Sequence, residues 1–290
     1  MSDSRHILIV SDGKLGHENQ SLGLAEAMGR IEAFETSIIV LNKHGGFFSR
    51  VRQSLKESRQ LPKPDFVIGA GHGTHLPLLA VAREHGACSV VLMKPGLPLS
   101  WFDWCIAPEH DFDKRPDRRG LILSKGALNR VVPSEGERSG NLILVGGPSK
   151  SHGYDEENLI LQIEEIAKEG EWEIVDSRRT PDSFRTALGS DLPSLVLSRH
   201  EDTPSGWLAD RLSKATEVWV TEDSVSMVYE ALTGGARVGI VDVPRLKSES
   251  RVVRGLELLK SQGYFLNGDS TDVSKPRLAE ADRCARCILA

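Results

Sequence analysis

The stretch WVTEDSVSMVYEALTGGARVGIVDV, residues 219–243, decides which fold we expect for this chain. Its first residues continue an apolar run from Glu217 to Val220, which predicts a buried strand. A polar elbow and a helical pattern follow, and Arg237–Val243 predicts a second buried strand. Continuous apolar strands that alternate with amphipathic helices are typical of a parallel sheet covered on both faces.

The elbow after the first strand concentrates polar side chains, namely Thr221, Glu222, Asp223, Ser224 and Ser226. Helix capping explains one or two of them, because Asp223 or Ser224 can accept hydrogen bonds from free N–H groups of the first turn. On a helical wheel, Val225, Val228 and Leu232 form the core side. The opposite side carries Asp223, Ser226, Met227 and Glu230. Such a face at the carboxyl end of a strand predicts a ligand site.

Composition limits the class of protein. The chain has 290 residues, 27% of them charged and 39% hydrophobic, which is typical of a soluble globular protein. The net charge of -5 leaves no broad basic field, so we expect no nucleic-acid partner. No apolar run approaches the ~20 residues that span a bilayer, and the N-terminus lacks a signal-peptide pattern. We therefore expect a cytoplasmic protein, with peripheral contact to a membrane left open.

The alternation of strands and helices runs through the chain and restarts once. Residues 131–140, VVPSEGERSG, are polar with Pro and Gly, which is typical of a linker between domains. We expect an N-terminal Rossmann-like domain at residues 1–133, a C-terminal one at 134–275, and a last helix within 276–290, with packing against the N-terminal domain as one option. The predicted fold class is α/β, with two doubly wound parallel-sheet domains facing a cleft.

A glycine-rich loop, GAGHGTH at residues 69–75, follows a predicted strand and opens a helix. It differs from a dinucleotide-binding loop because it lacks the third glycine, and the next strand ends without the acidic residue that would hold a ribose. An NAD-dependent oxidoreductase is therefore not expected. Gly71, His72 and Gly73 remain candidates for a substrate site in the cleft, because glycines let backbone N–H groups approach a substrate closely.

Cationic side chains follow three successive predicted strands of the C-terminal domain. Lys150 stands with Gly147 in GGPSKSH, residues 146–152, which is not a Walker loop. SRRTP and SRH then add Arg178, Arg179, Arg199 and His200. Cations at neighbouring strand ends predict an anionic ligand, most simply a diphosphate.

Polar loops of the N-terminal domain predict the catalytic groups. SDGKLGHENQ, residues 11–20, supplies Asp12, Lys14 and His17, and a histidine at the mouth of the cleft is suited to act as a general base near neutral pH. We predict that a carboxylate of this domain, such as Asp103, orients His17. Further candidates on the same side are Lys94, Glu109 and His110.

A metal ion is not expected. Cys284 and Cys287 form a C-x-x-C, but no two further ligands stand at a suitable spacing. The triplet Asp111-Phe112-Asp113 matches a D-x-D motif that binds a metal ion in one glycosyltransferase fold, although the two-domain pattern of this chain argues against that fold.

Several long motifs resemble one protein family. SDGKLGHENQSLGLAEA, GAGHGTHLPLLAVAR, VLMKPGLPLSWFDWCIAPEHD, SRRTP and VTEDSVSMVYEALTGG are similar to the ELM-type mitochondrial fission family, which has many bacterial members. The resemblance spans residues 5 to 270 and implies a two-Rossmann, GT-B glycosyltransferase-like fold. The family's plant members are associated with recruiting a dynamin-related protein to mitochondria.

The elbow also resembles the donor site of two-domain nucleotide-sugar transferases such as the peptidoglycan lipid-linked N-acetylglucosaminyltransferases. In those enzymes a serine at the helix start meets phosphate, and a glutamate six residues later grips the ribose; Ser224 and Glu230 have this spacing. The resemblance implies a metal-independent glycosyltransferase with a nucleotide-sugar donor and an acceptor of unknown identity, for which a lipid-linked or envelope glycan is one option. Two alternatives stay open, a non-catalytic adaptor and a nucleotide-sugar epimerase on the same fold.

Overall fold

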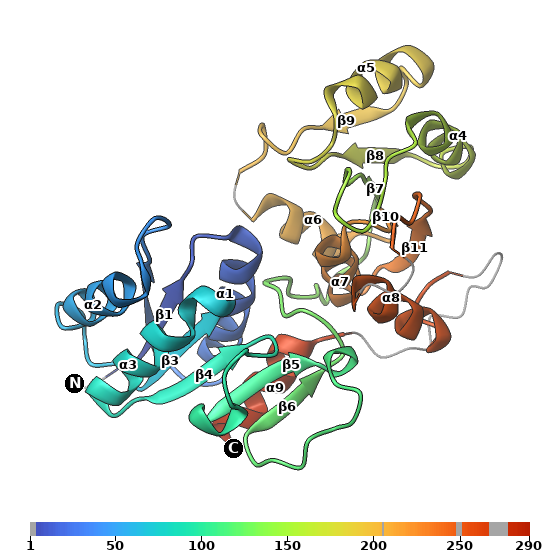
Figure 1. Cartoon of the computed structure of the whole chain (residues 1–290). Helices are drawn as coiled ribbons and strands as arrows, with labels where there is room; N and C mark the ends of the chain where they lie inside the picture. The colour runs from blue at the N-terminus through green and yellow to red at the C-terminus, as the bar shows by residue number, and fades with distance from the viewer. Residues whose placement is uncertain (1–3, 205, 248–250, 267–277) are drawn as a thin grey trace. The chain divides into compact units, whose positions relative to one another are not determined.

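The structure, a computed structural model, describes residues 4–204, 206–247, 251–266 and 278–290. The chain divides into two compact units (Figure 1), one of Met1–Arg130 with Ala279–Ala290 and the other of Val131–Leu278. The end of the predicted C-terminal domain and the predicted start of the last helix fall in residues 267–277, outside the described residues.

The first unit is built on a parallel sheet of six described strands in the order β2-β1-β3-β4-β5-β6. The strands are β1 (Arg5–Ser11), β2 (Phe34–Val40), β3 (Phe66–Ala70), β4 (Cys88–Leu92), β5 (Trp104–Pro108) and β6 (Leu121–Ser124). The helices are α1 (Leu15–Gly29), α2 (Phe47–Ser58), α3 (His75–His85) and α9 (Glu280–Leu289). Short 3-10 turns lie at His72–Thr74 (η1), Leu99–Trp101 (η2) and Glu109–Asp111 (η3).

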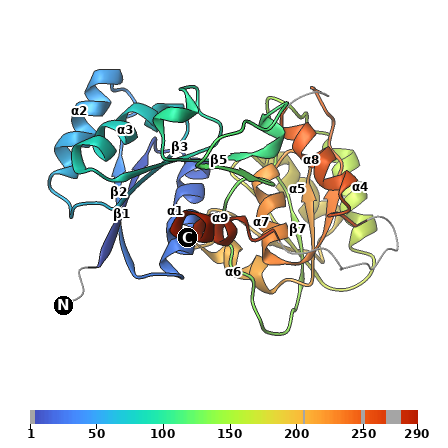
Figure 2. The ribbon, with the colours of Figure 1, turned by 90° about the horizontal axis from the view of Figure 1, so that it is seen from below.

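Alternate residues of β1 point into two different cores, which explains why its whole run is apolar. Ile7 and Ile9 pack on the face that α1 and α9 cover, and Leu8 and Val10 pack on the face that carries α3. Figure 2 shows α2 and α3 on one side of these strands and α1 on the other. The last helix is held to α1 by Arg30, whose guanidinium donates to Asp282 at 2.6 and 3.1 Å.

The second unit has a parallel sheet in which the structure describes five strands, in the order β11-β10-β7-β8-β9. The strands are β7 (Asn141–Leu144), β8 (Trp172–Val175), β9 (Val196–Ser198), β10 (Glu217–Thr221) and β11 (Arg237–Val241). The helices are α4 (Glu156–Ile166), α5 (Asp182–Asp191), α6 (Trp207–Lys214), α7 (Val225–Gly234) and α8 (Arg251–Ser261). The predicted fold class of two doubly wound parallel-sheet units is confirmed.

Two details differ from the sequence-based expectation. Helix α1 begins at Leu15, so His17, which was expected in a polar loop, lies in its first turn, where its N–H donates to the carbonyl of Lys14. Met227 was expected on an open helix face but is buried, because α6 also packs against α7: a Cβ at Gly234 would lie 2.3 Å from the carbonyl oxygen of Leu212. Within the described residues, no helix has the length and apolar character that crossing a bilayer requires.

Candidate functional site

Each sheet has a switch point, where chain connections leave in opposite directions and the following loops separate. In the first unit it lies between β1 and β3, and in the second between β7 and β10. Open α/β sheets bind ligands outside the carboxyl ends of the strands at such points. The loops after these four strands are therefore the places to look for chemistry.

At the first switch point, His17 pairs with Asp12. The Nδ1 atom of His17 lies 3.1 and 3.0 Å from the two carboxylate oxygens of Asp12. An ionised carboxylate only accepts hydrogen bonds, so Nδ1–H donates and Nε2 is left as the basic nitrogen. Burial alone would raise the pKa of Asp12, but the attraction of His17 and the N–H of Lys14 outweigh it and lower that pKa. The pair has the arrangement of a general base with its orienting acid.

The loop after β3 is shaped to receive the His17 ring. Gly71 has φ 86° and ψ 154°, a backbone conformation almost restricted to glycine. A Cβ at this position would lie 2.4 Å from both Cε1 and Nδ1 of His17. The glycine is therefore required by its backbone and by the histidine that lies against it.

Gly71→Ala should displace His17 from Asp12 and also strain the backbone by about 1–3 kcal/mol. We expect the ring resonances of His17 to shift in a ¹H–¹⁵N NMR spectrum and the melting temperature to fall. Gly86→Ala is the matched control, because Gly86 also has a positive φ but a Cβ there meets nothing within 4 Å. A Gly71→Ala protein with unchanged His17 resonances would refute this role of the glycine.

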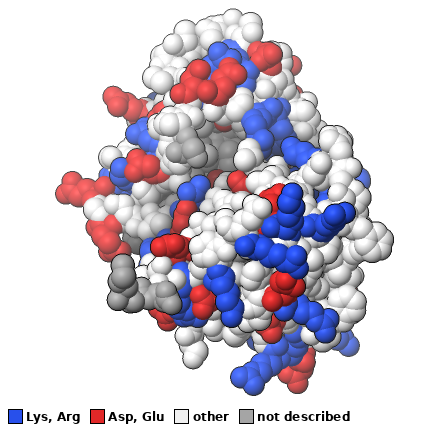
Figure 3. Space-filling model, turned by 90° about the vertical axis from the view of Figure 1, so that its left-hand side faces the viewer, with Lys and Arg blue, Asp and Glu red and all other residues white. Residues whose placement is uncertain are grey.

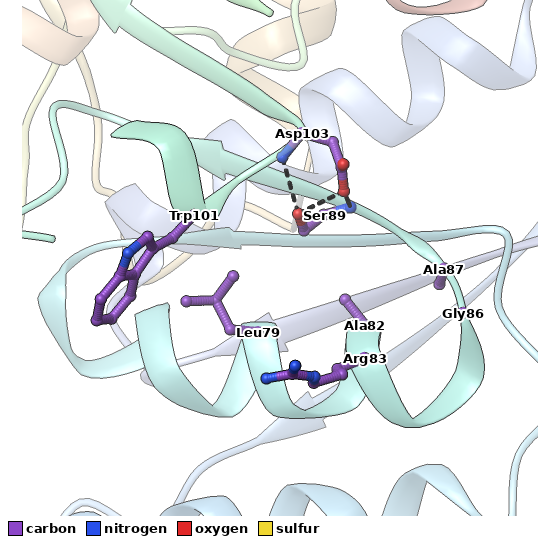
Figure 4. A pocket seen from close by; sticks show the side chains of 8 residues that line it. All are labelled: Leu79, Ala82, Arg83, Gly86, Ala87, Ser89, Trp101 and Asp103. Carbon is purple, nitrogen blue, oxygen red and sulfur yellow. Dashed lines mark hydrogen bonds between the residues drawn. The ribbon is translucent and has the colours of Figure 1, made fainter. Parts of the chain in front are cut away.

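The predicted pairing of Asp103 with His17 is wrong. Asp103 precedes β5, so it lies at the amino end of the sheet, whereas His17 follows the carboxyl end of β1. One carboxylate oxygen of Asp103 accepts hydrogen bonds from the N–H of Ser89 at 2.8 Å and from its hydroxyl at 2.7 Å (Figure 4). Asp103 thus connects β5 to β4. The role of orienting His17, predicted for Asp103, is taken by Asp12.

The other candidates of the first unit gather around neighbouring loops. The ammonium of Lys14 lies 3.2 Å from Asp12, and a Cβ at Gly73 would lie 3.6 Å from the Cβ of Asp12. His72 is exposed and lies against Gly96 of the loop after β4. In that loop Lys94 donates to the carbonyl of Asp111 at 2.7 Å, so it is held by the turn η3, which carries Glu109 and His110.

At the second switch point, the polar elbow ties two loops together. The hydroxyl oxygen of Thr221 accepts from the N–H of Gly146 at 2.7 Å, and a carboxylate oxygen of Asp223 accepts from the N–H of Gly147 at 3.0 Å. A Cβ at Gly146 would lie 2.2 Å from that same Asp223 oxygen. The elbow's Thr221 and Asp223 are therefore used inside the protein, and neither caps α7.

Arg179 lies across this switch point. Its guanidinium donates to the carbonyl of Gly147 at 2.6 Å and lies 2.7 Å from the buried carboxylate of Asp223. Arg179 and its neighbour Arg178, both named from the sequence, are exposed in the turn after β8, but Arg178 forms no ion pair with a described residue. The sequence pattern could not distinguish the two, because the partners of Arg179, Gly147 and Asp223, lie 32 and 44 residues away in the chain.

The remaining cations differ in their availability. Lys150 and Arg178 are exposed and form no ion pair with a described residue, whereas Arg199 pairs with Glu201. Glu222, predicted to touch the ligand, is buried and held by Arg245, with 2.9 Å between a guanidinium nitrogen and a carboxylate oxygen. The negative charge of Glu222 is thus offset within the protein.

Helix α7 keeps two features that suit a ligand. Its N-cap residue Ser224 makes no side-chain capping bond, and the N–H groups of Val225, Ser226 and Met227 find no acceptor among the described residues. Glu230, half-buried one turn further along, forms no hydrogen bond or ion pair with a described residue. Burial raises the pKa of Glu230 to about 7. Free N–H groups at a helix start favour an anion.

Within the described ranges, no group of three or more His, Cys, Asp or Glu side chains is arranged so that it could hold a metal ion. The predicted absence of a metal stays a prediction.

Two Rossmann-like units, each with polar groups at its switch point, define the GT-B class of α/β protein. The sequence profile of the family described as mitochondrial fission ELM1 matches residues 15–290. The chain therefore belongs to this family, as its motifs predicted. A curated relative, the uncharacterized protein RP120 of Rickettsia prowazekii (strain Madrid E), is 23% identical over 300 residues, which cover 84% of this chain and 85% of that protein.

Solved structures of the same fold include three enzymes. MurG of Acinetobacter baumannii is 15% identical, with a TM-score of 0.53 over 99% of this chain and 91% of that chain. UDP-GlcNAc 2-epimerase of Neisseria meningitidis, bound to UDP-GlcNAc, is 12% identical, with a TM-score of 0.58 over 98% of each chain. UGT2 of Phytolacca americana, with UDP-2fluoro-glucose and pterostilbene, is 11% identical, with a TM-score of 0.52 over 98% and 89%. At these identities the likeness shows the fold.

Proposed function

We propose that this protein is a glycosyltransferase that binds a nucleotide-sugar at the second unit's switch point and needs no metal ion. The observation that carries the proposal is Glu230, a half-buried carboxyl group without a partner among the described residues, about one helix turn beyond the unpaired N–H groups at the start of α7. Among the described residues of the second unit, no hydrogen-bond donor reaches this carboxyl, although polar groups removed from water are normally hydrogen-bonded. A pair of ribose hydroxyls would supply that donor.

The same loops would hold the diphosphate. The N–H groups at the start of α7 and the hydroxyl of Ser224 face the anion, as in other phosphate sites at helix starts. Arg179 adds a cation that is already held in place by Gly147 and Asp223, so little side-chain entropy is lost on binding. Negative charge that develops on the leaving group is then stabilised without a metal.

The first unit would supply the base. Nε2 of His17 takes the proton of an acceptor hydroxyl as the new glycosidic bond forms, and Asp12 stabilises the resulting imidazolium. The nucleoside diphosphate leaves with the electron pair of the broken sugar–phosphate bond. Uridine nucleotides are the first to test, because two of the solved structures that share this chain's fold contain UDP-GlcNAc or UDP-2fluoro-glucose.

A time course followed by ¹H and ³¹P NMR tests the reaction class. With a UDP-sugar, a candidate acceptor hydroxyl and a chelator present, we expect release of nucleoside diphosphate together with a new anomeric signal. If the nucleotide-sugar is isomerised when no acceptor is present, the protein is an epimerase and not a transferase. Binding without turnover, together with a stable protein partner in pull-down, would favour the adaptor.

A further inference from the structure

The loop before α2 and the helix itself carry a charge opposite to that of the whole chain. Residues 41–63 hold six cations and one acid, a net charge of +5, whereas the whole chain has -5 and its remaining residues therefore -10. The cations are Lys43, Arg50, Arg52, Lys56, Arg59 and Lys63. Figure 3 faces the side on which α2 lies in Figure 1, and Lys and Arg side chains gather across its lower right part.

Two phenylalanines stand uncovered at the start of the same helix. Phe48 is 83% exposed, more than any other large hydrophobic residue described, and Phe47 is 48% exposed. Their rings touch edge to face, with centroids 5.0 Å apart. Helix α2 packs its other side mainly against α3, with Leu55 against the core, so neither ring is needed for the core.

The loop that presents these residues is well fixed. The guanidinium of Arg50 donates to the carbonyls of Asn42 at 3.1 Å and Lys43 at 2.8 Å, and the amide of Gln53 donates to Val40 at 3.0 Å. Lys43, Arg52 and Lys56 form no ion pair with any residue that the structure describes, so their charges remain available. The aromatic pair and the cations thus form one pre-arranged surface, which we call the Phe47–Lys56 face.

We propose that the Phe47–Lys56 face docks on an anionic lipid bilayer, with the two phenyl rings in the interface and the cations against lipid headgroups. Aromatic rings and Lys or Arg on one helix are the combination that binds the surface of anionic membranes. A bilayer interface fits better than a nucleic-acid duplex, because it accommodates two exposed apolar rings beside the cations, whereas a duplex presents mainly phosphate and sugar to a protein. This inference is independent of the proposed glycosyl transfer.

Docking here would bring the membrane surface beside the His17–Asp12 pair. Helix α2 starts at the carboxyl edge of the first sheet, as α1 does. A Cβ at Gly13 would lie 3.0 Å from Cε of Lys43, and one at Gly73 would lie 3.0 Å from a guanidinium nitrogen of Arg50. The loop cations therefore reach the loops that hold Asp12.

Co-sedimentation with vesicles tests the proposal. The full chain should bind vesicles of phosphatidylcholine with phosphatidylglycerol, bind pure phosphatidylcholine weakly, and be released by about 1 M salt. Reversing two charges in Arg52→Glu/Lys56→Glu should weaken binding at least ~25-fold. Phe47→Ser/Phe48→Ser should weaken it about tenfold or more, because the rings no longer enter the interface.

Two matched variants control for charge and for apolar area. Lys114→Glu/Arg115→Glu makes the same change in net charge on another exposed loop, and Leu161→Ser removes another exposed apolar side chain, 58% exposed on α4. Both should bind as the wild type does. Equal binding to neutral and anionic vesicles, no loss in either α2 variant, or tighter binding to a single-stranded RNA than to vesicles would overturn the proposal.

Discussion

Glu230→Gln should make the protein more stable at pH 8 and at the same time a poorer nucleotide binder. The carboxyl pKa is about 7 in the folded protein against 4.5 for the unconstrained group. The folded state therefore holds more protons between these two values, and the free energy of unfolding falls as pH rises through that window. Above pH 7 the cost reaches about 3 kcal/mol, which a neutral amide avoids.

The same substitution should weaken nucleoside diphosphate binding about 10-fold to 150-fold, because a charged hydrogen-bond partner contributes about 1.5–3 kcal/mol. Thermal unfolding from pH 5 to 8 and titration calorimetry measure the two effects. Ser226→Ala is a suitable control, since Ser226 is exposed on the same helix and its hydroxyl forms no bond in the described structure. Equal nucleotide affinity in the wild type and in Glu230→Gln would refute the assignment of the nucleotide to this site.

His17→Ala should reduce turnover about 10²-fold to 10⁴-fold while donor affinity changes little. The base and the donor-binding groups belong to different units of the chain, so the loss should appear in kcat and leave the donor Kd unchanged. Asp12→Asn should also reduce turnover strongly, because an amide can donate to Nδ1 and hold the wrong tautomer of the ring, and because it withdraws the charge that stabilises the imidazolium.

His44→Ala is the matched control for His17, since His44 is an exposed histidine of the first unit and its ring makes no described hydrogen bond. It should keep full turnover. A His17→Ala protein as active as the wild type would show that another group takes the acceptor proton.

The fold was predictable because the central strands, such as β1, are buried on both faces. Ile7, Leu8, Ile9 and Val10 are all fully buried, so the apolar run marks the strand without any alternation. The restart of the pattern after residues 131–140 separates two sheets for the same reason. Predicting the strands and the two sheets needs only local hydrophobic patterns, which can be read directly from the sequence.

The site was less predictable, because its contacts join residues far apart in the chain. Asp12 and His17 lie five residues apart and were both named from the sequence. Rejecting Asp103 as the partner of His17 required knowing that Asp103 precedes its strand and so lies at the opposite end of the sheet. Arg179 meets Gly147 and Asp223 only in the folded unit. A clue was present, since Gly146 and Gly147 together mark a close backbone approach, for which a neighbouring cation is a natural partner.

The polar side chains of the elbow and of helix α7 fall into two groups. Thr221, Glu222 and Asp223 serve the protein itself, through Gly146, Arg245 and Gly147. Ser224 and Glu230 are left without described side-chain partners, and they are the pair that the resemblance assigns to phosphate and ribose.

Titration calorimetry of the full chain with UDP and with UDP-GlcNAc, in the presence of a chelator, tests the central claim most directly. We expect one nucleotide per chain, with affinity that falls in Glu230→Gln and stays unchanged in His17→Ala. Absence of binding heat with every common nucleoside diphosphate, confirmed by an unchanged melting temperature, would contradict the assignment of a nucleotide-sugar site to this protein.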